Sequence, residues 1–340
     1  MSNNRIKVVM VDPLSSEQLN FLQGIADAYE LELSAPQDED RDRLIKLLQN
    51  ADAVVVQRQV FGEVYMRSAP NLKMIQKMGG RRDRIDVAKA RQLGLAVALM
   101  SLPGSVAVAE HTFALILALA KNIILAHEYT VKGAYRNLGI EPKITTERSH
   151  GFQWMKMNDS IVELRGKSLG IIGFGDIGNE IAKRANAFEM KVIYYNRTRL
   201  ESDLETELQV QFGSLTDVLQ QSDFVTLNTP LTPQTEKMIG KTELDMMKSS
   251  AYLINTSRGG VIDEIALVEA LRNKRIAGAG LDVFVKEPIP FDHPYLALKN
   301  VVLTPHIGGG RGGARESQAR AIFTNIRNFF NGQPVEYRIV

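Results

Sequence analysis

The feature that most constrains the fold is a glycine-rich turn between a strand-like run and a helical pattern. The stretch GFGDIG at 173–178 follows the apolar run Ser168–Ile172, and a second β-rich run, Lys191–Tyr195, follows the helical pattern. In such a βαβ unit the first glycine permits a tight turn, the second lets the backbone approach a pyrophosphate, and the third lets helix pack on strand. The N–H groups of the helix N-terminus favour phosphate. The expected dinucleotide contacts in this turn are Gly173, Gly175, Asp176, Ile177 and Gly178.

Strand-like runs and helical patterns alternate along most of the chain, which predicts parallel α/β sheets. A length of 340 residues suggests about two domains. The expected strands are Lys7–Val11, Leu31–Ser34, Ala53–Gln57, Lys73–Lys77, Ala96–Ala98, Ser168–Ile172, Lys191–Tyr195, Phe224–Asn228, Tyr252–Asn255, Gly278–Val283 and Val301–Thr304. The expected helices are Ser15–Tyr29, Arg41–Gln49, Asp86–Leu93, one helix from Val106 to about Ala126 after a break at Pro103 and Gly104, and Ala314–Phe330, which should pack on the first domain.

Composition narrows the class of protein. Hydrophobic residues make up 44% and charged residues 24%, as in ordinary globular proteins. The net charge of +2 is too small to indicate a nucleic-acid partner, and the absence of cysteine excludes disulfides and a thiol nucleophile. The longest apolar stretch, near Phe113–Ala120, is shorter than the ~20 residues of a membrane span. We expect a soluble cytoplasmic protein with no membrane partner and no metal site.

The residues after the second strand of the nucleotide-binding unit bear on the choice of cofactor. NAD-specific folds usually place a carboxylate there to accept the ribose 2′-hydroxyl. This chain has Asn196, Arg197, Thr198 and Arg199 instead. Without the carboxylate a 2′-phosphate is not repelled, and an arginine can bind it through charged hydrogen bonds. We therefore favour NADP(H), with NAD(H) possible; the alternative is that both arginines are merely solvated.

Polar residues in the C-terminal half match the needs of hydride transfer to a keto acid. The reaction needs a cation for the carboxylate and carbonyl, a general acid, and a carboxylate that orients the acid. Arg258 follows one predicted strand, Asp282 and Glu287 follow another, and His306 follows a third. Because open α/β sheets bind ligands beyond the carboxyl ends of their strands, we expect these side chains to form one site.

These stretches resemble the D-isomer-specific 2-hydroxyacid dehydrogenases over essentially the whole chain. The resemblance lies in LPGSVAVAEHTFALILALAK at 102–121, GKSLGIIGFGDIG at 166–178, INTSRGGVIDEIALVEALRNKRIAGAGLDVFVKEP at 254–288 and LTPHIGG at 303–309. It implies that Arg258 binds the substrate carboxylate and carbonyl oxygen. It also implies that His306 is the acid–base residue and Glu287 its partner, and that Asp282 holds the nicotinamide carboxamide.

The resemblance further implies the domain arrangement and other contacts. A dinucleotide-binding domain, 102–307, would be inserted into a smaller flavodoxin-like substrate domain, 1–101 with 308–340. A homodimer would be held by the helix and arm at about 106–160. The implied cofactor contacts besides the glycine turn are Val106, Asn196, Arg197, Thr198, Thr229, Pro230, Thr235, Thr256, Ser257, Asp282, His306 and Gly308.

The chain departs from the family in its substrate loop, KMGGRRDRID, which supplies Gly79, Gly80 and Arg81 as expected substrate contacts. Arg81 stands where the family has a second glycine. Either it binds a second anionic group of the substrate, or it turns outward while the backbone does the usual work. Arg58 either faces the cleft or is solvated. The additional segment 139–158 either extends the dimer arm or reaches the partner's active site.

Three functions follow from these observations. The leading hypothesis is an NADP(H)-preferring reductase of a small 2-keto acid, with glyoxylate or hydroxypyruvate suggested by the resemblance alone. An alternative is an NAD-dependent dehydrogenase of a phosphorylated or dicarboxylic 2-hydroxy acid, such as 3-phosphoglycerate. A distant alternative is a nicotinamide-sensing, corepressor-like binding module. Turnover of any 2-keto acid separates the enzymes from the binding module.

Overall fold

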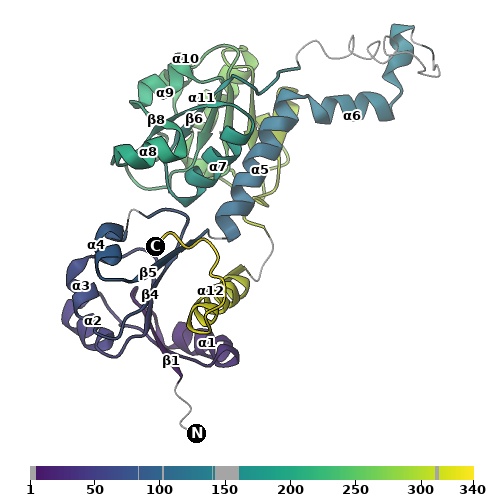
Figure 1. Ribbon diagram of the computed structural model, residues 1–340. Coiled ribbons are helices and arrows are strands. Elements are labelled where there is room, and N and C mark those ends of the chain that lie inside the picture. Colours follow the sequence, from purple (N-terminus) through teal and green to yellow (C-terminus); the bar gives the residue numbers. More distant parts are fainter. Residues whose placement is uncertain (1–4, 83, 102, 140, 142–160, 311–313) are drawn as a thin grey trace. The chain divides into compact units, whose positions relative to one another are not determined.

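The computed structural model describes residues 5–82, 84–101, 103–139, 141, 161–310 and 314–340 (Figure 1). The chain divides into two compact units. The first comprises Met1–Val106 and Gly310–Val340, and the second comprises Ala107–Gly309. Each unit is built on one parallel sheet with helices on both faces, which confirms the predicted α/β fold class.

The sheet of the first unit has the strand order β2-β1-β3-β4-β5. This is the flavodoxin-like order that the resemblance implied. Its strands are β1 Ile6–Met10, β2 Leu31–Ser34, β3 Ala53–Val56, β4 Met74–Met78 and β5 Ala96–Met100. Its helices are α1 Ser16–Ala26, the 3₁₀ helix η1 Asp27–Tyr29, α2 Arg41–Leu48, α3 Glu63–Arg67, α4 Val87–Gln92 and α12 Ala314–Phe330.

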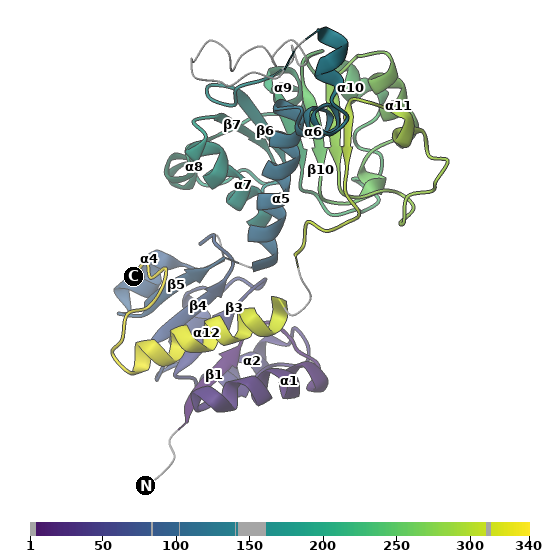
Figure 2. The same cartoon turned by 90° about the vertical axis from the view of Figure 1, so that its right-hand side faces the viewer.

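Both faces of the first sheet are buried, because its strands alternate apolar side chains between two cores. Val8 of β1 belongs to the core that α1 and α12 cover, whereas Val9 belongs to the core on the opposite face. Helix α12 contributes Ile322 and Phe323 to the first of these cores, and it lies along α1 (Figure 2). The prediction that the C-terminal helix returns to the first domain is confirmed.

The sheet of the second unit has the order β12-β11-β10-β9-β6-β7-β8. The order of the strands reverses between β6 and β9, because β7 and β8 follow on one side of β6 and β9 to β12 follow on the other. Dinucleotides bind at this point in this class of fold. Its strands are β6 Ser168–Ile172, β7 Lys191–Tyr195, β8 Val210–Phe212, β9 Phe224–Leu227, β10 Tyr252–Asn255, β11 Gly278–Leu281 and β12 Val301–Leu303. Its helices are α6 Ile123–Val131, η2 Ala134–Leu138, α7 Asp176–Ala187, α8 Ser202–Leu208, α9 Leu215–Gln221, α10 Lys241–Met246, η4 Gly259–Val261, α11 Glu264–Arg272 and η5 Pro294–Ala297.

The prediction of one helix from Val106 to about Ala126 is wrong. Helix α5 spans Pro103–Ala120, so the residues expected to break the chain form its first turn instead. A proline fits there, because the first N–H groups of a helix have no partner within the helix. Asn122 then adopts the left-handed conformation with φ 49°, and α6 leaves at an angle of 59°. Among the described residues no single helix is long and apolar enough to cross a membrane. The bent pair Gly104–Ala120 and Ile123–Val131 passes that test together, by length and composition alone.

A buried hydrogen-bond network ties α12 to the first sheet. The Asn325 side chain is 2% exposed; its amide donates to Gln76 Oε1 at 2.7 Å, and its oxygen accepts the Glu336 N–H at 2.8 Å. Gln76, on β4, is fully buried and donates to the Ala98 carbonyl of β5 at 3.3 Å. A buried polar group that loses its partner keeps its desolvation cost.

We expect Asn325→Leu to lower the free energy of unfolding by about 1–3 kcal/mol, because it leaves the buried Gln76 oxygen and the Glu336 N–H unpaired. Urea denaturation followed by circular dichroism measures this loss. Thr324→Ala, at the exposed neighbouring position, is the control and should change it by less than about 0.5 kcal/mol. Equal effects of the two variants would contradict the assigned role of the network.

Candidate active site

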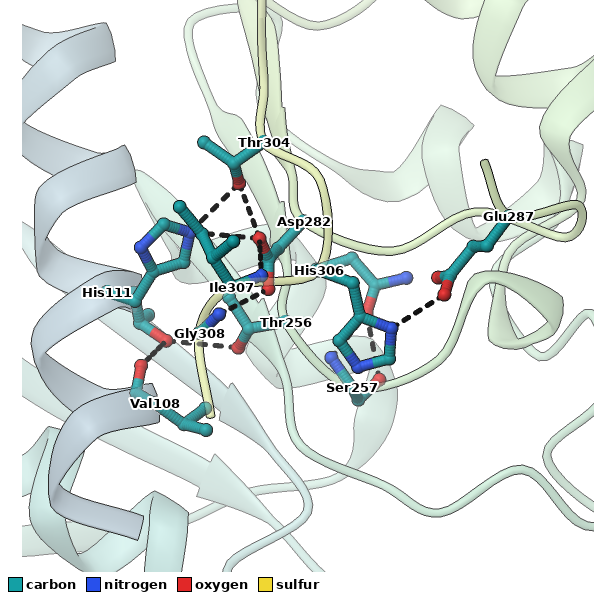
Figure 3. Close-up of polar contacts among 12 residues, drawn as sticks. Val108, His111, Thr256, Ser257, Asp282, Glu287, Thr304, His306, Ile307 and Gly308 are labelled. Carbon is teal, nitrogen blue, oxygen red and sulfur yellow. Dashed lines mark hydrogen bonds and ion pairs between the residues drawn. The ribbon is translucent and has the colours of Figure 1, made fainter. Parts of the chain in front are cut away.

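Three segments leave the same edge of the second sheet side by side. In the register of the parallel strands, Asn255 of β10 pairs with Leu281 of β11, which pairs with Leu303 of β12. The residues that follow therefore emerge together at the carboxyl edge. This geometry brings the segments that begin at Thr256, Asp282 and Thr304 into one region (Figure 3).

His306 and Glu287 form a close pair at this edge. His306 Nδ1 lies 2.6 Å from Glu287 Oε2, and the other carboxylate oxygen accepts the Phe284 N–H at 3.1 Å (Figure 3). The two side chains are 44% and 36% exposed, so a ligand can reach them. His306 Nε2 forms no hydrogen bond with the described residues, which leaves this nitrogen available to a ligand.

Opposing effects act on the ionisation of Glu287. Burial disfavours the carboxylate, but the hydrogen bonds from His306 and the Phe284 N–H, together with the charge of Arg258, outweigh it. The pKa of Glu287 is therefore held below its usual value. An ionised Glu287 can accept a hydrogen bond from His306 Nδ1 and so fix the orientation of the ring.

Arg258 is placed by a turn that Asn255 organises. Asn255 is 1% exposed; its oxygen accepts the Ser257 N–H at 3.0 Å and its amide donates to the Arg258 carbonyl at 2.9 Å. The exposed Arg258 side chain donates to the Ser257 carbonyl at 2.6 Å and forms no ion pair with the described residues. Most of its donors thus remain available to an anion.

The turn that carries Arg258 packs directly against the loop that carries Glu287. A Cβ atom built on Gly259 would lie 2.0 Å from the Phe284 carbonyl carbon, so no side chain fits there. The absence of a side chain at this position is what allows the two loops to touch. The structure therefore brings Arg258, Glu287 and His306 to one edge, as predicted.

Asp282 is buried, unlike the partly exposed His306 and Glu287. Its side chain is 1% exposed, and its carboxylate accepts hydrogen bonds from Thr304 Oγ1 at 2.6 Å and from the N–H groups of Ile307 and Gly308 at 3.0 and 2.9 Å (Figure 3). His111 Nε2, on α5, lies 3.1 Å from the same carboxylate. The predicted contact of Asp282 with a nicotinamide carboxamide stays a prediction.

The glycine turn has the geometry that a pyrophosphate requires. Gly173 has φ 88°, and a Cβ there would lie 2.8 Å from Asn228. A Cβ on Gly178 would lie 2.9 Å from the Gly173 carbonyl oxygen, so this glycine is needed for close packing. Gly175 is exposed with open space at its Cβ position, and no side chain caps the N-terminus of α7 behind it. The residues present therefore fit a dinucleotide.

The two arginines after β7 have different environments. Arg199 binds Glu205 through two hydrogen bonds of 2.9 and 2.8 Å, and Glu205 is only 10% exposed. Arg197 is exposed and forms no ion pair with the described residues. Asn196 fixes the turn, because its oxygen accepts the Phe174 N–H at 3.3 Å and its amide donates to the Thr198 carbonyl at 2.9 Å. Arg197 is thus the better placed of the two for a ligand.

Other predicted cofactor residues shape loops at the same edge. Thr235 donates to the Pro230 carbonyl at 2.6 Å and closes the turn that follows Thr229. Thr256 Oγ1 lies 3.1 Å from Thr112 Oγ1 of α5, and the Ser257 hydroxyl lies 2.8 Å from Asn255 Oδ1. Their contacts with a cofactor stay predictions.

The predicted substrate loop lies in the other unit. Gly79 follows β4 with φ 119°, a conformation that requires glycine, and its N–H donates to the Met100 carbonyl at 2.7 Å. Contacts of Gly79, Gly80 and Arg81 with substrate, and of Val106 with cofactor, stay predictions. Asp83 and most of the segment 139–158 lie outside the described residues.

Residues 113–308 match the family model for the NAD-binding domain of D-isomer specific 2-hydroxyacid dehydrogenases. The chain belongs to this family. Glyoxylate reductase of Thermococcus litoralis is 39% identical over 92% of this chain and 91% of its own length.

Two solved structures of this family's fold are similar to the chain. The match to a glyoxylate reductase from Paecilomyes thermophila covers 98% of this chain and 98% of that protein, at 25% identity and a TM-score of 0.55. An acyclic imino acid reductase in complex with NADPH and D-Arg covers 98% of this chain and 100% of its own, at 29% identity and a TM-score of 0.54.

As a D-isomer specific 2-hydroxyacid dehydrogenase, the protein is an NAD(P)-dependent oxidoreductase that acts on small 2-hydroxy acids. The residues that match the family's NAD-binding domain, 113–308, lie in the second unit, which also carries the open glycine turn. Sequence reasoning assigned no role to His111, Thr304 or Asn255. A threonine and an asparagine at strand ends were available signals, whereas His111 lies on a different element, far away in sequence.

We expect Gly259→Ala to destabilise this dehydrogenase by about 1–3 kcal/mol or more and to abolish turnover, because the new methyl group forces the Arg258 and Glu287 loops apart. Gly260→Ala is the matched control. There the added Cβ would meet the flexible end of Leu231 at 3.0 Å, which can move aside. Thermal melting and 2-keto acid reduction measure both effects, and a fully active Gly259→Ala enzyme would show that the close approach is not required.

Proposed function

We propose that this dehydrogenase is an NADPH-preferring reductase of a small 2-keto acid of the glyoxylate or hydroxypyruvate type. The observation that carries the chemistry is the 2.6 Å contact between His306 and Glu287, with Arg258 close enough to lower the pKa of Glu287. Relatives named glyoxylate reductase support the substrate class.

In the proposed reaction a bound nicotinamide supplies the hydride to C2 of the keto acid. Arg258 binds the substrate carboxylate and draws electron density toward the carbonyl oxygen. His306 donates the proton from Nε2 to that oxygen as negative charge develops on it. Glu287, ionised because its pKa is lowered, orients the ring through Nδ1 and stabilises its protonated form.

The preference for NADPH rests on the exposed Arg197 and on the lack of a carboxylate at position 196. Arg199 is engaged with the largely buried Glu205, and releasing it would leave that carboxylate without its main partner. A structural relative of the chain that binds NADPH supports the same preference. Homodimer formation, cytoplasmic location and the nicotinamide contact of Asp282 are retained as predictions.

We expect Glu287→Gln to lower kcat for keto-acid reduction about 10²-fold at neutral pH. The loss should shrink as the pH falls through the lowered pKa of Glu287, because the wild-type carboxyl is then uncharged like the amide. Initial rates followed at 340 nm between pH 3.5 and 8 measure this trend. Glu269→Gln, at an exposed position of α11, is the control. A loss that is the same at every pH would argue against the acid–base pair.

We expect the wild-type enzyme to reduce glyoxylate or hydroxypyruvate faster with NADPH than with NADH. Arg197→Ala should lower kcat/KM for NADPH about 10-fold or more and leave that for NADH nearly unchanged, because it removes the 2′-phosphate ligand. The panel includes phosphorylated and dicarboxylic keto acids. A preference for NADH would overturn the cofactor proposal, and a preference for a doubly anionic substrate would overturn the substrate proposal.

A further inference from the structure

A buried carboxylate, Asp282, collects donors from two separate segments, the one that follows β12 and helix α5. Thr304 follows β12, Ile307 and Gly308 lie in the next loop, and His111 lies on α5. All of these groups belong to the second unit and converge on one carboxylate in Figure 3. A charge that is 1% exposed needs such donors, because losing a partner of a buried ion is costly.

The hydrogen atoms in this cluster have one consistent arrangement. Asp282 is acceptor-only when ionised, so the Thr304 hydroxyl donates to it over 2.6 Å. The Thr304 oxygen then accepts from His111 Nε2 over 2.9 Å, and the same nitrogen lies 3.1 Å from Asp282 Oδ1. His111 must therefore carry its hydrogen on Nε2.

Helix and strand periodicity explain why His111 meets Asp282. Side chains four residues apart share one face of a helix, and residues two apart share one face of a strand. A Cβ on Gly280 of β11 would lie 3.0 Å from Leu115 Cβ and 3.3 Å from Leu119 Cδ1, so α5 packs closely on this strand. One turn before Leu115 stands His111, and two residues after Gly280 stands Asp282.

The cluster fixes the loop that carries His306. His306 has φ 55°, a left-handed conformation that is strained for a residue other than glycine. Its N–H donates to the Asp282 carbonyl at 2.8 Å, while the next two N–H groups donate to the Asp282 carboxylate. A Cβ on Gly308 would lie 2.9 Å from Asp282 Oδ2 and 3.3 Å from His111 Cδ2. The loop is thus held by the hydrogen bonds of its N–H groups to Asp282 and by the close packing of Gly308 against Asp282 and His111.

We propose that His111 and Thr304 are positioning residues for the reaction, which act through Asp282 to hold His306 in its left-handed conformation toward Glu287. The inference rests on the proposed catalytic role of His306. It assigns α5 a function in catalysis, because the helix supplies the donor that completes the buried carboxylate. A displaced His306 would meet its substrate in a poorer geometry, which lowers the rate of the chemical step.

The test compares variants that keep or remove each donor in the full-length enzyme. His111→Gln retains an N–H donor near the Nε2 position, whereas His111→Leu does not. Thr304→Ser retains the hydroxyl, whereas Thr304→Val does not. Glu269→Gln, at an exposed position of α11 outside the predicted dimer segment, is the control. All variants are first checked by thermal melting.

We expect His111→Leu and Thr304→Val to lower kcat for glyoxylate reduction about 10- to 100-fold, with KM changed less than about 3-fold. His111→Gln and Thr304→Ser should stay within about 3-fold of wild type in both parameters. The double variant His111→Leu, Thr304→Val should be little worse than the poorer single variant, because both act through one carboxylate. A His111→Gln enzyme as impaired as His111→Leu would overturn the proposal.

Hydrogen exchange provides a readout that does not need turnover. Amide exchange in peptides covering 301–310 should accelerate about 10-fold in His111→Leu and Thr304→Val, and stay near wild type in His111→Gln and Thr304→Ser. Unchanged exchange in the donor-less variants would overturn the proposed clamp. If wild type reduces no 2-keto acid, the proposed function fails, while the exchange experiment still decides whether His111 and Thr304 hold the loop.

Discussion

The Asp282 carboxylate is the interaction on which the geometry of the candidate site depends. It lies at the end of a buried strand where water is excluded, so its charge must be balanced by donors from the protein. Thr304 and the N–H groups of Ile307 and Gly308 supply most of them. Because these donors belong to the segment that surrounds His306, the hydrogen bonds that satisfy the buried charge also place the exposed imidazole.

The two acidic residues after β11 consequently serve opposite purposes. Asp282 directs its oxygens inward, to groups that are fixed by the sheet and by α5. Glu287 is partly exposed, has a lowered pKa, and directs its charge to the imidazole that faces a ligand. A rigid inner carboxylate and an accessible outer one are what an acid–base site needs, since the outer pair must exchange protons without moving.

The sequence predicted the strands that have a clear hydrophobic pattern. Strands such as Ser168–Ile172 and Tyr252–Asn255 were predicted with their exact bounds, because apolar runs bounded by turn residues are local signals. The short strand Val210–Phe212 and helix Glu63–Arg67 were missed, since neither has enough residues to show a period. The break before α6 was missed because it depends on one left-handed asparagine inside an apolar stretch.

The residues of the candidate site also divide into those that a local pattern predicts and those that only packing brings together. Arg258, Glu287 and His306 were predicted to lie together because each follows a strand, and parallel strands end at one edge. The meeting of His111 with Asp282 depends on how α5 packs on β11, which no local pattern records. The sequence therefore predicted which exposed side chains meet at this edge, but not His111, whose position depends on how the helix packs on the strand.

The same reasoning separates the arginines after β7. Arg197 and Arg199 are near neighbours in sequence, and Arg197 was the predicted cofactor contact. Folding makes them unequal, because Glu205 on α8 binds both Arg199 and the hydroxyl of Tyr194. Arg199 lowers the pKa of Glu205. If Arg199 left Glu205 to bind a phosphate, a mostly buried carboxylate would lose its main partner. Of the two arginines, Arg197 is the one that gives up no partner among the described residues on binding an anion, which is why the proposed preference for NADPH rests on it.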